Sequence, residues 1–402
     1  MNTAAPLASG RVNGESAGDP VQRARTLRPQ IEAAAQAIER ERALPRELLA
    51  ALHDARLFRL LLPRSCGGEE VAPAVFVAAV EELAKADASV AWCMAQGSGC
   101  SMAAAYLDPA VAQEIFSGHE AVLAWGPGAG NAKAIAVEGG YRVSGTWPYA
   151  SGSRHAQWLG GHAHLLDADG RPLLGPDGKP AERTLLFPKT KAAITDVWHV
   201  VGLKGTGSDT YTVTALFVPA RYAFTRESAD DRREAGPLYR LTTFQLYGCG
   251  FAAVALGIAR AMLDAFIAMA VAKVAMLGTK PIRESAVVQA KVAGAEARWQ
   301  SARAFLMRTL DDCWDSVSRG ESLSLQQRAA LRLAGVYATE QCREVVEIAY
   351  HLAGGSAIFE NQAFERRLRD MHAVTQQVQG QLVNFEHVGQ VLLGLPSASR
   401  LI

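Results

Sequence analysis

The feature that most constrains the fold of this chain is a double change in the spacing of its apolar residues. From 21 to about 116 these residues recur every three or four positions, as in amphipathic helices. Between 121 and 224 short β-branched and aromatic runs are punctuated by Gly, Pro and Asp, which is typical of strands. From 242 onward the helical spacing returns with few helix breakers. We therefore expect a helical, a β and a second helical region, in that order.

Local sequence signals predict several element boundaries. Pro45 stands where a helix can begin, and Pro63 with Gly67-Gly68 ends the next helical segment. Gly139-Gly140 separates two alternating runs, as in a β-hairpin. The strand spacing, without alternating helices, indicates a compact antiparallel barrel or sandwich and argues against a Rossmann domain. Three long segments of helical spacing predict an up-down bundle: 251–276, 285–319 and 324–352.

Composition narrows the class of protein. At 402 residues the chain exceeds a typical single domain, and its 49% hydrophobic content is enough for a large core. Its 41 basic residues offset 40 acidic ones, so no net field attracts nucleic acid or an anionic membrane. We find no 18-residue uncharged apolar run and therefore expect no transmembrane helix. Residues 1–20 lack the regions of a signal peptide and are predicted to form a disordered tail.

The cysteines and histidines follow no ligand or disulfide pattern. Six cysteines show neither CxxC nor paired spacing, and in a chain of this length we interpret them as reduced thiols. No His/Cys cluster has the spacing of a zinc site, so no metal is expected. The cytoplasm is the expected compartment.

Four segments resemble, in the right order, the acyl-CoA dehydrogenase superfamily. They are LPRELLAALHDARLFRLLLPRSCGGEEV (44–71), WPYASGSRHAQW (147–158), VGLKGTGSDTYTV (201–213) and LAGGSAIFENQAFERRLRDMHAVTQ (352–376). The resemblance covers about residues 25–395. It implies an α+β multidomain fold, a flavin bound between the β domain and the bundle, and a homotetramer.

The same resemblance implies the domain boundaries. Residues 21–120 would form an N-terminal helical domain and residues 121–231 a central antiparallel β-barrel domain. Residues 232–402 would form a C-terminal four-helix bundle domain.

The resemblance also implies which residues contact the flavin. Ser151 falls where the family places a hydroxyl group against flavin N5, and a hydroxyl there can stabilise the charged states of that atom. Trp147 or Tyr149 falls where an aromatic side chain lies along the isoalloxazine ring. The other expected cofactor contacts are Trp125, Gly152, Gly354 and Gly355. Taken alone, Ser151 is typical of the start of a Ser-Gly-Ser turn.

The catalytic acid of the family is missing from this chain. Acyl-CoA dehydrogenases remove the α-proton of a thioester with a carboxylate, commonly from a Glu-Gly-Thr motif beyond an Arg-Asp pair. Here Arg369-Asp370 is followed by Val378-Gln379-Gly380, and the alternative position early in the bundle holds Gln245 and Tyr247. None of these candidate positions offers a carboxylate to abstract a carbon-bound proton. Ordinary acyl-CoA dehydrogenation is therefore not expected.

A second departure concerns the cofactor. Family dehydrogenases carry an Arg-x-x-Phe-Gly segment that reaches the FAD diphosphate of a neighbouring subunit. This chain has Arg283 in a shifted position and no Phe-Gly. We therefore expect reduced FMN or FAD, supplied by a separate flavin reductase.

Both departures indicate a resemblance to the superfamily's two-component flavin-dependent monooxygenases. Members have a His just after the Arg-Asp pair, matched here by His372, and imidazole suits proton transfer near neutral pH. Taken alone, one His in a polar helix is more often a surface or capping residue. Many members have a second His where this chain has Cys100 or Ser101. We expect Trp92, Cys100 and Tyr247 to line the substrate pocket.

The predicted function is hydroxylation of an aromatic or heteroaromatic substrate with reduced flavin and O2, with Ser151 and His372 as the catalytic residues. Two alternatives stay open. One is a divergent acyl-CoA dehydrogenase or oxidase with bound FAD acting on a thioester. The other is a binding protein that keeps the scaffold without turnover.

Overall fold

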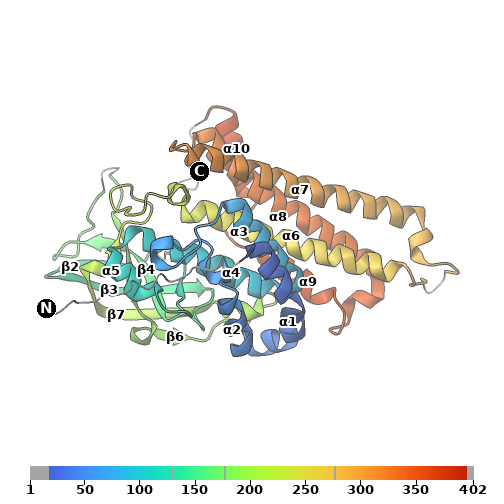
Figure 1. The fold of residues 1–402 in the computed structure, drawn as a ribbon, viewed down its shortest axis with the longest axis horizontal. Coiled ribbons are helices and arrows are strands. Elements are labelled where there is room, and N and C mark those ends of the chain that lie inside the picture. The colour runs from blue at the N-terminus through green and yellow to red at the C-terminus, as the bar shows by residue number, and fades with distance from the viewer. Residues whose placement is uncertain (1–17, 129, 176–177, 276–277, 396–402) are drawn as a thin grey trace, which may run out of the picture.

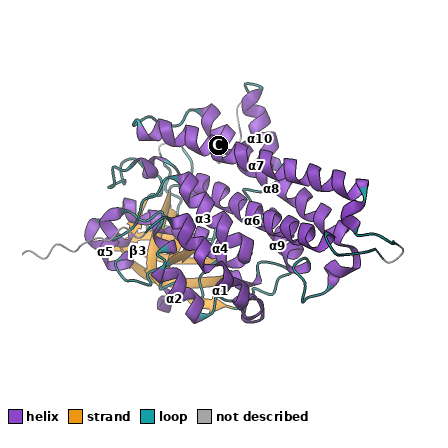
Figure 2. Ribbon diagram, turned by 45° about the vertical axis from the view of Figure 1, so that its right-hand side comes forward, coloured by secondary structure: helices purple, strands orange, loops and turns teal. Residues whose placement is uncertain are grey.

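The computed structural model describes residues 18–128, 130–175, 178–275 and 278–395. It confirms the predicted order of helices, strands and long helices along the chain (Figure 1). Figure 2 shows the strands gathered toward one end of the molecule, with the long helices extending away from them. Most of the predicted tail, residues 1–17, lies outside the described residues.

The N-terminal domain contains, within the described residues, the α-helices α1 (Pro20–Glu41), α2 (Arg46–Asp54), α3 (Pro73–Ala86), α4 (Ala88–Ser101) and α5 (Pro109–Phe116). Asp19 caps α1 by accepting a hydrogen bond from Val21 N, so this helix begins inside the stretch predicted as a tail. Proline at the first position begins α1, α3 and α5, where its missing N–H leaves no bond unmade. Every residue of α4 is buried, because this helix packs against the sheet as well as against α3 and the bundle.

The central domain is a sheet whose described strands are β1 (Leu123–Trp125), β2 (Lys133–Val137), β3 (Gly140–Ala150), β4 (Trp158–Leu166), β5 (Glu182–Pro188), β6 (Ala193–Thr195), β7 (Asp209–Pro219) and β8 (Ala223–Phe224). The order across the sheet is β6-β7-β3-β2-β4-β5-β8, and β1 pairs with β4. The predicted hairpin at Gly139-Gly140 joins β2 and β3. Most pairs are antiparallel as predicted, but β1 and β2 run parallel to β4. The parallel pairing of β2 with β4 arises because β3 lies on the other side of β2, and the sequence pattern carries no signal for it.

The C-terminal domain contains α6 (Thr243–Ala270), α7 (Ala286–Ser318), α8 (Leu325–Ala353), α9 (Glu365–Thr375) and α10 (Val383–Leu392). The three long helices lie side by side as a bundle, as predicted (Figure 1). Complete capping boxes begin two of them, from Thr242 with Gln245 at α6 and from Ser324 with Gln327 at α8. Helix α6 packs against α3, α4 and α8 and so joins the bundle to the N-terminal domain.

Helix α6 corrects one expectation from the sequence. By length and composition it is apolar enough to cross a membrane, although no such stretch was expected. In the structure 67% of its most apolar window is buried inside the protein. Its apolar character is therefore that of a core helix.

All six cysteines are buried and free, as their spacing predicts. Burial raises the pKa of the Cys100 and Cys249 thiols to about 12 and that of Cys313 to about 11. It also raises the pKa of Cys66, Cys93 and Cys342. The thiols are therefore protonated at neutral pH.

The contact between α6 and α3 depends on Gly257. A Cβ atom at this position would lie 2.5 Å from Ala84 Cβ and 2.5 Å from the Glu81 carbonyl oxygen. Real Cβ atoms do not approach other atoms so closely, so the two helices would have to move apart. A glycine is required here because the two backbones approach closely.

We therefore predict that Gly257→Ala lowers the free energy of unfolding by about 1–3 kcal/mol, the usual cost of overpacking a core. Gly294→Ala is the matched control, because Gly294 lies exposed in α7 and a Cβ atom added there would have nothing within 4 Å. That substitution should stabilise the protein by about 0.5–1 kcal/mol, since glycine costs entropy inside a helix. Denaturant unfolding of the two variants measures both changes. Equal effects of the two substitutions would contradict the close approach at Gly257.

Candidate active site

Ser151 lies in the turn after β3 and is held by side chains from two other segments. Its Oγ accepts a hydrogen bond from Trp92 Nε1 of α4 at 3.0 Å and lies 2.7 Å from Ser208 Oγ. The next residue, Gly152, has a φ of +79° and donates its N–H to the Thr206 carbonyl at 3.0 Å. Ser151 is only 7% exposed. The hydroxyl predicted to face flavin N5 is therefore fixed in position.

The segment from 202 to 208, called here the anchor segment, contacts four parts of the molecule. Leu203 N donates to Asp370 Oδ1 of α9 at 2.6 Å, and Gly205 N donates to Ser89 Oγ of α4 at 3.1 Å. A Cβ on Gly205 would lie 2.1 Å from Ile38 Cγ2 of α1. Through Ser208 the same segment reaches Ser151. The turn that carries Ser151 and the helix that carries His372 are thus joined through one segment.

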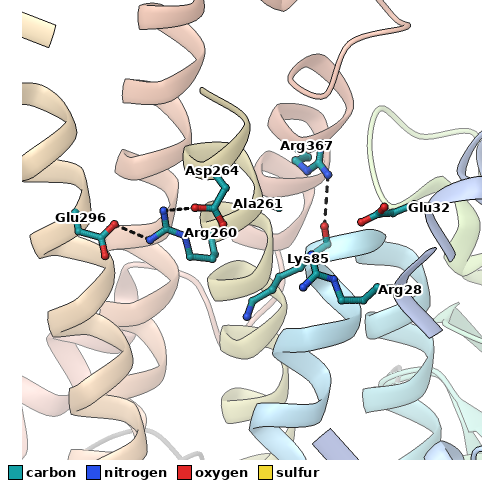
Figure 3. Close-up of a pocket in the computed structure, with 8 residues that line it drawn as sticks. All are labelled: Arg28, Glu32, Lys85, Arg260, Ala261, Asp264, Glu296 and Arg367. Atoms are coloured by element: carbon teal, nitrogen blue, oxygen red, sulfur yellow. Dashed lines mark hydrogen bonds and ion pairs between the residues drawn. The ribbon is translucent and has the colours of Figure 1, made fainter. Parts of the chain in front are cut away.

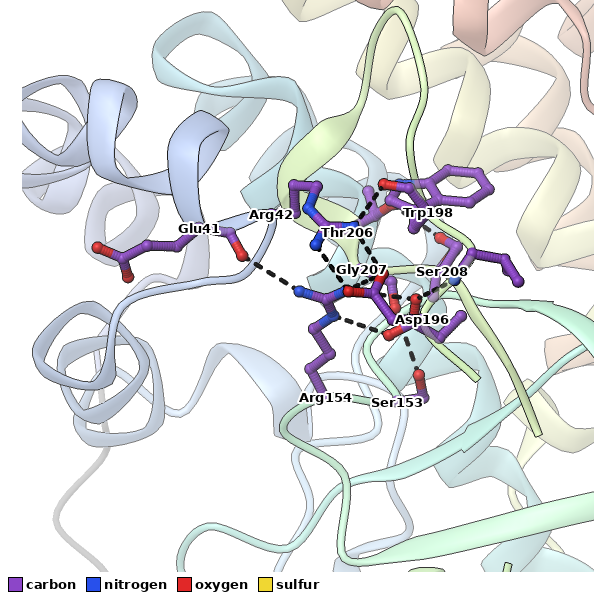
Figure 4. Close-up of polar contacts among 12 residues, drawn as sticks. Glu41, Arg42, Ser153, Arg154, Asp196, Trp198, Thr206, Gly207 and Ser208 are labelled. Atoms are coloured by element: carbon purple, nitrogen blue, oxygen red, sulfur yellow. Dashed lines mark hydrogen bonds and ion pairs between the residues drawn. The ribbon is translucent and has the colours of Figure 1, made fainter. Parts of the chain in front are cut away.

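An ion-pair cluster fixes the outer side of this turn (Figure 4). Arg154 Nε donates to Asp209 Oδ2 at 2.8 Å, and its two Nη atoms donate to Asp196 Oδ1 and to the Glu41 carbonyl, each at 3.1 Å. Arg42 binds Asp196 through two hydrogen bonds of 2.6 and 2.7 Å. The two guanidinium groups lower the pKa of Asp196 to about 2. The end of α1 is thereby tied to the start of β7.

Asp370 and Asp87 are two buried acids behind the anchor segment. Burial raises the pKa of Asp370 to about 7, and the negative charge of Asp87 adds to this effect. Asp87 caps α4 by accepting from Ser89 N and Val90 N, and burial raises its pKa as well. Asp370 therefore changes its charge near neutral pH at the point where it holds Leu203.

The three residues expected to line the substrate pocket lie together. The Trp92 ring stacks on Phe251 of α6 with centroids 3.8 Å apart, and Phe251 stacks on Tyr247 at 5.5 Å. The Tyr247 hydroxyl lies 3.2 Å from Cys100 Sγ, and its ring occupies the space that a side chain on Gly99 would need. All are buried, and burial raises the pKa of Tyr247 well above its ordinary value. The structure brings these residues together as a neutral aromatic stack between α4 and α6.

The three predicted aromatic cofactor contacts have different environments. Trp147 is fully buried in the β domain, where its Nε1 donates to the His162 carbonyl at 3.1 Å and its ring stacks on Tyr211. Trp125 is also buried and meets the His162 ring edge-on at 5.2 Å. Tyr149 differs from both, because it is 63% exposed and has a φ of +58°. A non-glycine residue with this backbone conformation is uncommon and points to a local constraint.

His372 lies on α9 with about half of its side chain exposed. Its Nε2 is 3.9 Å from Glu347 Oε1 of α8, a carboxylate that also binds Arg343. Asp370 lies two positions earlier on the same helix, so the two side chains project from different faces. Gly354 and Gly355, predicted to contact the cofactor, follow α8 and are exposed. Within the described residues, no side-chain hydrogen bond or ion pair joins His372 to the aromatic stack.

Of the candidate positions for a family acid, Gln245 and Gln379 line one cavity, whereas the Tyr247 side chain lies against Cys100 of α4. A Cβ on Gly248 would lie 3.8 Å from the Gln379 side chain and 3.8 Å from Arg332 Nη1. Gln379 is buried, and burial lowers the pKa of Arg332 to about 10. A cavity at this point is lined by Gln245, Gly248, Arg328, Leu331, Arg332, Gly335 and Gln379. None of these residues is acidic, so no carboxylate stands at Gln245 or at Gln379.

A larger cavity of about 530 Å³ lies elsewhere, among α1, α3, α6, α7 and α9 (Figure 3). Arg260, one of its lining residues, binds Asp264 and Glu296 at 2.6 Å each. Lys85 and Arg28, on the opposite wall, both pair with Glu82. None of the predicted site residues lines this cavity. Its charges largely satisfy one another, so we assign it no role in the reaction.

Sequence reasoning missed part of this arrangement. Thr206 and Ser208 were visible only as members of a Gly-Thr-Gly-Ser hairpin, whose glycines a turn alone would explain. The sequence pattern marks Phe251 only as an apolar residue of a helix. Asp370 was used only to locate the Arg-Asp pair, and no role was predicted for it. Arg226 was also missed, although its positive charge acts on the pKa of Cys100 and Tyr247. Among the described residues, no cluster of three or more His, Cys, Asp or Glu could hold a metal ion.

The chain is similar to several known proteins. The acyl-CoA dehydrogenase N-terminal domain model matches residues 22–116, and the acyl-CoA dehydrogenase C-terminal domain model matches residues 249–381. Indole-3-acetate monooxygenase of Pseudomonas putida is 29% identical over 89% of both chains. The flavin-dependent monooxygenase oxygenase subunit HsaA of Mycobacterium tuberculosis is 28% identical over 86% of this chain and 88% of its own. XiaF from Streptomyces, solved with FADH2 and glycerol, superimposes with a TM-score of 0.88 at 22% identity, over 95% of this chain and 97% of its own.

The buried acid on α9 gives a testable pH dependence. The folded protein retains the Asp370 proton up to about pH 7, whereas an unfolded chain releases it near the ordinary value of 3.8. Stability from this group is therefore lost as the pH rises between these values. The Asp370→Asn side chain keeps an oxygen that can accept a hydrogen bond from Leu203 N. Unlike the carboxyl group, the amide does not ionise. Between about pH 5 and about pH 8 the variant should lose less unfolding free energy than the wild type.

Denaturant unfolding at both pH values measures this difference. Asp169→Asn is the control, because the Asp169 side chain is 70% exposed. It should follow the wild-type pH dependence. Parallel pH profiles for Asp370→Asn and the wild type would show that Asp370 is ionised throughout.

Proposed function

Because the chain belongs to the acyl-CoA dehydrogenase superfamily, we propose which branch of its chemistry it performs: it is the oxygenase component of a flavin-dependent monooxygenase that hydroxylates an aromatic or heteroaromatic substrate. One observation carries the choice of branch. Gln245, Tyr247 and Gln379 stand at the positions from which family dehydrogenases supply a catalytic carboxylate, and none of them is an acid. A neutral amide or a protonated phenol cannot abstract the α-proton of a thioester. Two of the similar proteins, indole-3-acetate monooxygenase and HsaA, are named as monooxygenases, and this supports the same branch.

The residues around Ser151 fit a flavin. A buried hydroxyl with fixed partners, next to aromatic side chains and without an ionised group in direct contact, suits the polar edge of an isoalloxazine ring. Ser151 and Gly152 would hold that edge at N5. Tyr149, exposed and conformationally constrained, would lie along the ring, with Trp125 and Trp147 supporting the sheet behind it. When bound, reduced flavin supplies the activation of O2 and the transfer of one oxygen atom to the substrate.

The chain's own residues would then bind the substrate and handle protons. The stacked rings of Trp92, Phe251 and Tyr247 would form an apolar wall of the substrate pocket and exclude water from it. Cys100 and Tyr247 stay protonated, so they would give this side of the pocket no charge. His372 would take up or deliver a proton, with Glu347 at 3.9 Å orienting its imidazole.

The same proposal includes partners and assembly. An oxygenase component requires a separate reductase that delivers reduced FMN or FAD, and the cytoplasm holds the reduced nicotinamides that such reductases use. We propose a homotetramer, the assembly that the family resemblance implies, and the large apolar side chains exposed at two places on the bundle support subunit contacts there. One group includes Val271, Val274, Val287, Ile358 and Phe359, and the other Leu392, Leu393 and Leu395. Exposed apolar patches of this kind mark interaction surfaces.

The activity is tested by supplying the protein with reduced FMN or FAD, 18O2 and a panel of phenols and indoles. We expect one 18O atom in the product of at least one aromatic compound, detected by mass spectrometry. We also expect that an acyl-CoA panel fails to bleach oxidised FAD added to the protein. Bleaching by an acyl-CoA without labelled aromatic product would instead assign the chain to thioester dehydrogenation. A protein that binds no flavin in either redox state would be a scaffold without turnover.

The proposed roles of Ser151 and His372 are tested separately. Ser151→Ala should lower the yield of hydroxylated product per reduced flavin about tenfold and raise hydrogen peroxide release, because one hydrogen bond to the cofactor is lost. His372→Asn should lower the hydroxylation rate by about 10²- to 10⁴-fold, the usual contribution of a general acid or base. His351→Asn is the control. The His351 imidazole is exposed and also contacts Glu347, because its Nδ1 lies 2.7 Å from the backbone carbonyl oxygen of Glu347. Equal losses in both histidine variants would remove His372 from the reaction.

A further inference from the structure

Three buried hydroxyl groups form a chain that ends at Ser151. Ser151 Oγ lies 2.7 Å from Ser208 Oγ, and Ser208 Oγ lies 2.7 Å from Thr206 Oγ1. Thr206 Oγ1 lies 2.9 Å from the Leu203 carbonyl oxygen. At the other end, Trp92 Nε1 lies 3.0 Å from Ser151 Oγ. The part of this chain within the anchor segment is drawn in Figure 4.

The two ends of the chain fix the direction of every hydrogen bond in it. A carbonyl oxygen can only accept, so Thr206 donates its proton to Leu203. The Thr206 oxygen must then accept from Ser208. Because each hydroxyl has one proton, the Ser208 oxygen must in turn accept from Ser151. An indole N–H can only donate, so Ser151 also accepts from Trp92.

The same contacts disfavour the reverse arrangement, in which Thr206 donates to Ser208 and Ser208 donates to Ser151. It would leave the Thr206 and Leu203 oxygens 2.9 Å apart without a proton between them, and burial would leave this repulsion unscreened. Thr206 and Ser208 are each 2% exposed and Ser151 is 7% exposed, so bulk water does not compete for these groups. Ser151 therefore has no proton left for a ligand, and the hydrogen bond that it can still form is one that it accepts.

This direction matters because the two redox states of a flavin differ at N5. Reduced isoalloxazine carries a hydrogen on N5 and can donate it, whereas oxidised N5 has a lone pair and can only accept. We propose that Thr206 and Ser208 are positioning residues that hold Ser151 as an acceptor and thereby make the site select reduced over oxidised flavin. The inference rests on the proposed function, because it requires a flavin whose N5 lies at Ser151. It explains how an oxygenase could take up reduced flavin and release the oxidised form.

The test compares the dissociation constants of oxidised and of dithionite-reduced FMN and FAD, measured without oxygen. The wild type should bind the reduced form more tightly. In Thr206→Val, Ser208 loses its acceptor and can donate to Ser151, which frees the Ser151 proton for oxidised N5. The ratio Kd(oxidised)/Kd(reduced) should fall about tenfold, the value of one neutral hydrogen bond. The midpoint potential of the bound flavin should fall by about 30 mV, the equivalent of a tenfold change for two electrons.

Three further variants separate this effect from damage to the fold. Ser208→Ala removes the acceptor of the Ser151 proton directly and should lower the ratio in the same direction. Thr206→Ser keeps the hydroxyl group at this position and should therefore keep the wild-type ratio. Thr212→Val is the matched control. The Thr212 Oγ1 lies 2.9 Å from Thr146 Oγ1 on the neighbouring strand, and Thr212 does not belong to the chain of hydroxyl groups that ends at Ser151. It should also keep the wild-type ratio.

The outcomes distinguish this inference from the proposed function. A wild type that prefers reduced flavin, with Thr206→Val and Ser208→Ala within about twofold of its ratio, would overturn the inference and leave the function standing, since a lost hydrogen bond changes binding by more than this. A wild type that binds oxidised flavin at least as tightly would also overturn the inference. Failure to bind flavin in either redox state would overturn the proposed function itself.

Discussion

The arrangement of this protein depends on how backbone N–H groups of the anchor segment are satisfied. A loop between strands has no ladder to donate to, and its buried N–H groups are costly without acceptors. Asp370 and Ser89 provide these acceptors, and they belong to α9 and α4. The C-terminal and N-terminal domains are thus both attached to the β domain at the segment that orients Ser151. A shift of either helix would move the hydroxyl chain with it.

The proposed chemistry follows from the residues around the hydroxyl chain and equally from the absence of the family's catalytic carboxylate. The dehydrogenase reaction needs a carboxylate and a hydride acceptor on opposite sides of a thioester. This protein keeps the scaffold and the hydroxyl, and has Gln245, Tyr247 and Gln379 at the positions from which the family supplies its acid. The buried acids that do lie near the site, Asp87 and Asp370, accept hydrogen bonds from backbone N–H groups. Asp87 caps α4 and Asp370 holds the anchor segment, so both act in positioning the fold around the site.

The sequence predicts the three-part fold well, because periodic apolar residues, Pro at helix starts and the Gly139-Gly140 hairpin are local signals. It does not predict the parallel pairing of β2 with β4, since that depends on which side of β2 the third strand takes. For the site, Phe251 stacks between the rings of Trp92 and Tyr247, and Cys100 lies against the Tyr247 hydroxyl. That these residues line a substrate pocket stays a prediction. The hydroxyl chain was not foreseen, because Thr206 and Ser208 are close to Ser151 only in three dimensions. The placement of His372 relative to a bound flavin stays a prediction.

The buried cysteines have a consequence for how long such a catalyst survives. A protein that brings electrons to O2 releases some hydrogen peroxide, and peroxide attacks thiolates far faster than thiols. Burial keeps all six sulfur atoms protonated and out of contact with solvent. Turnover therefore leaves these six thiols largely unoxidised by the peroxide that it releases.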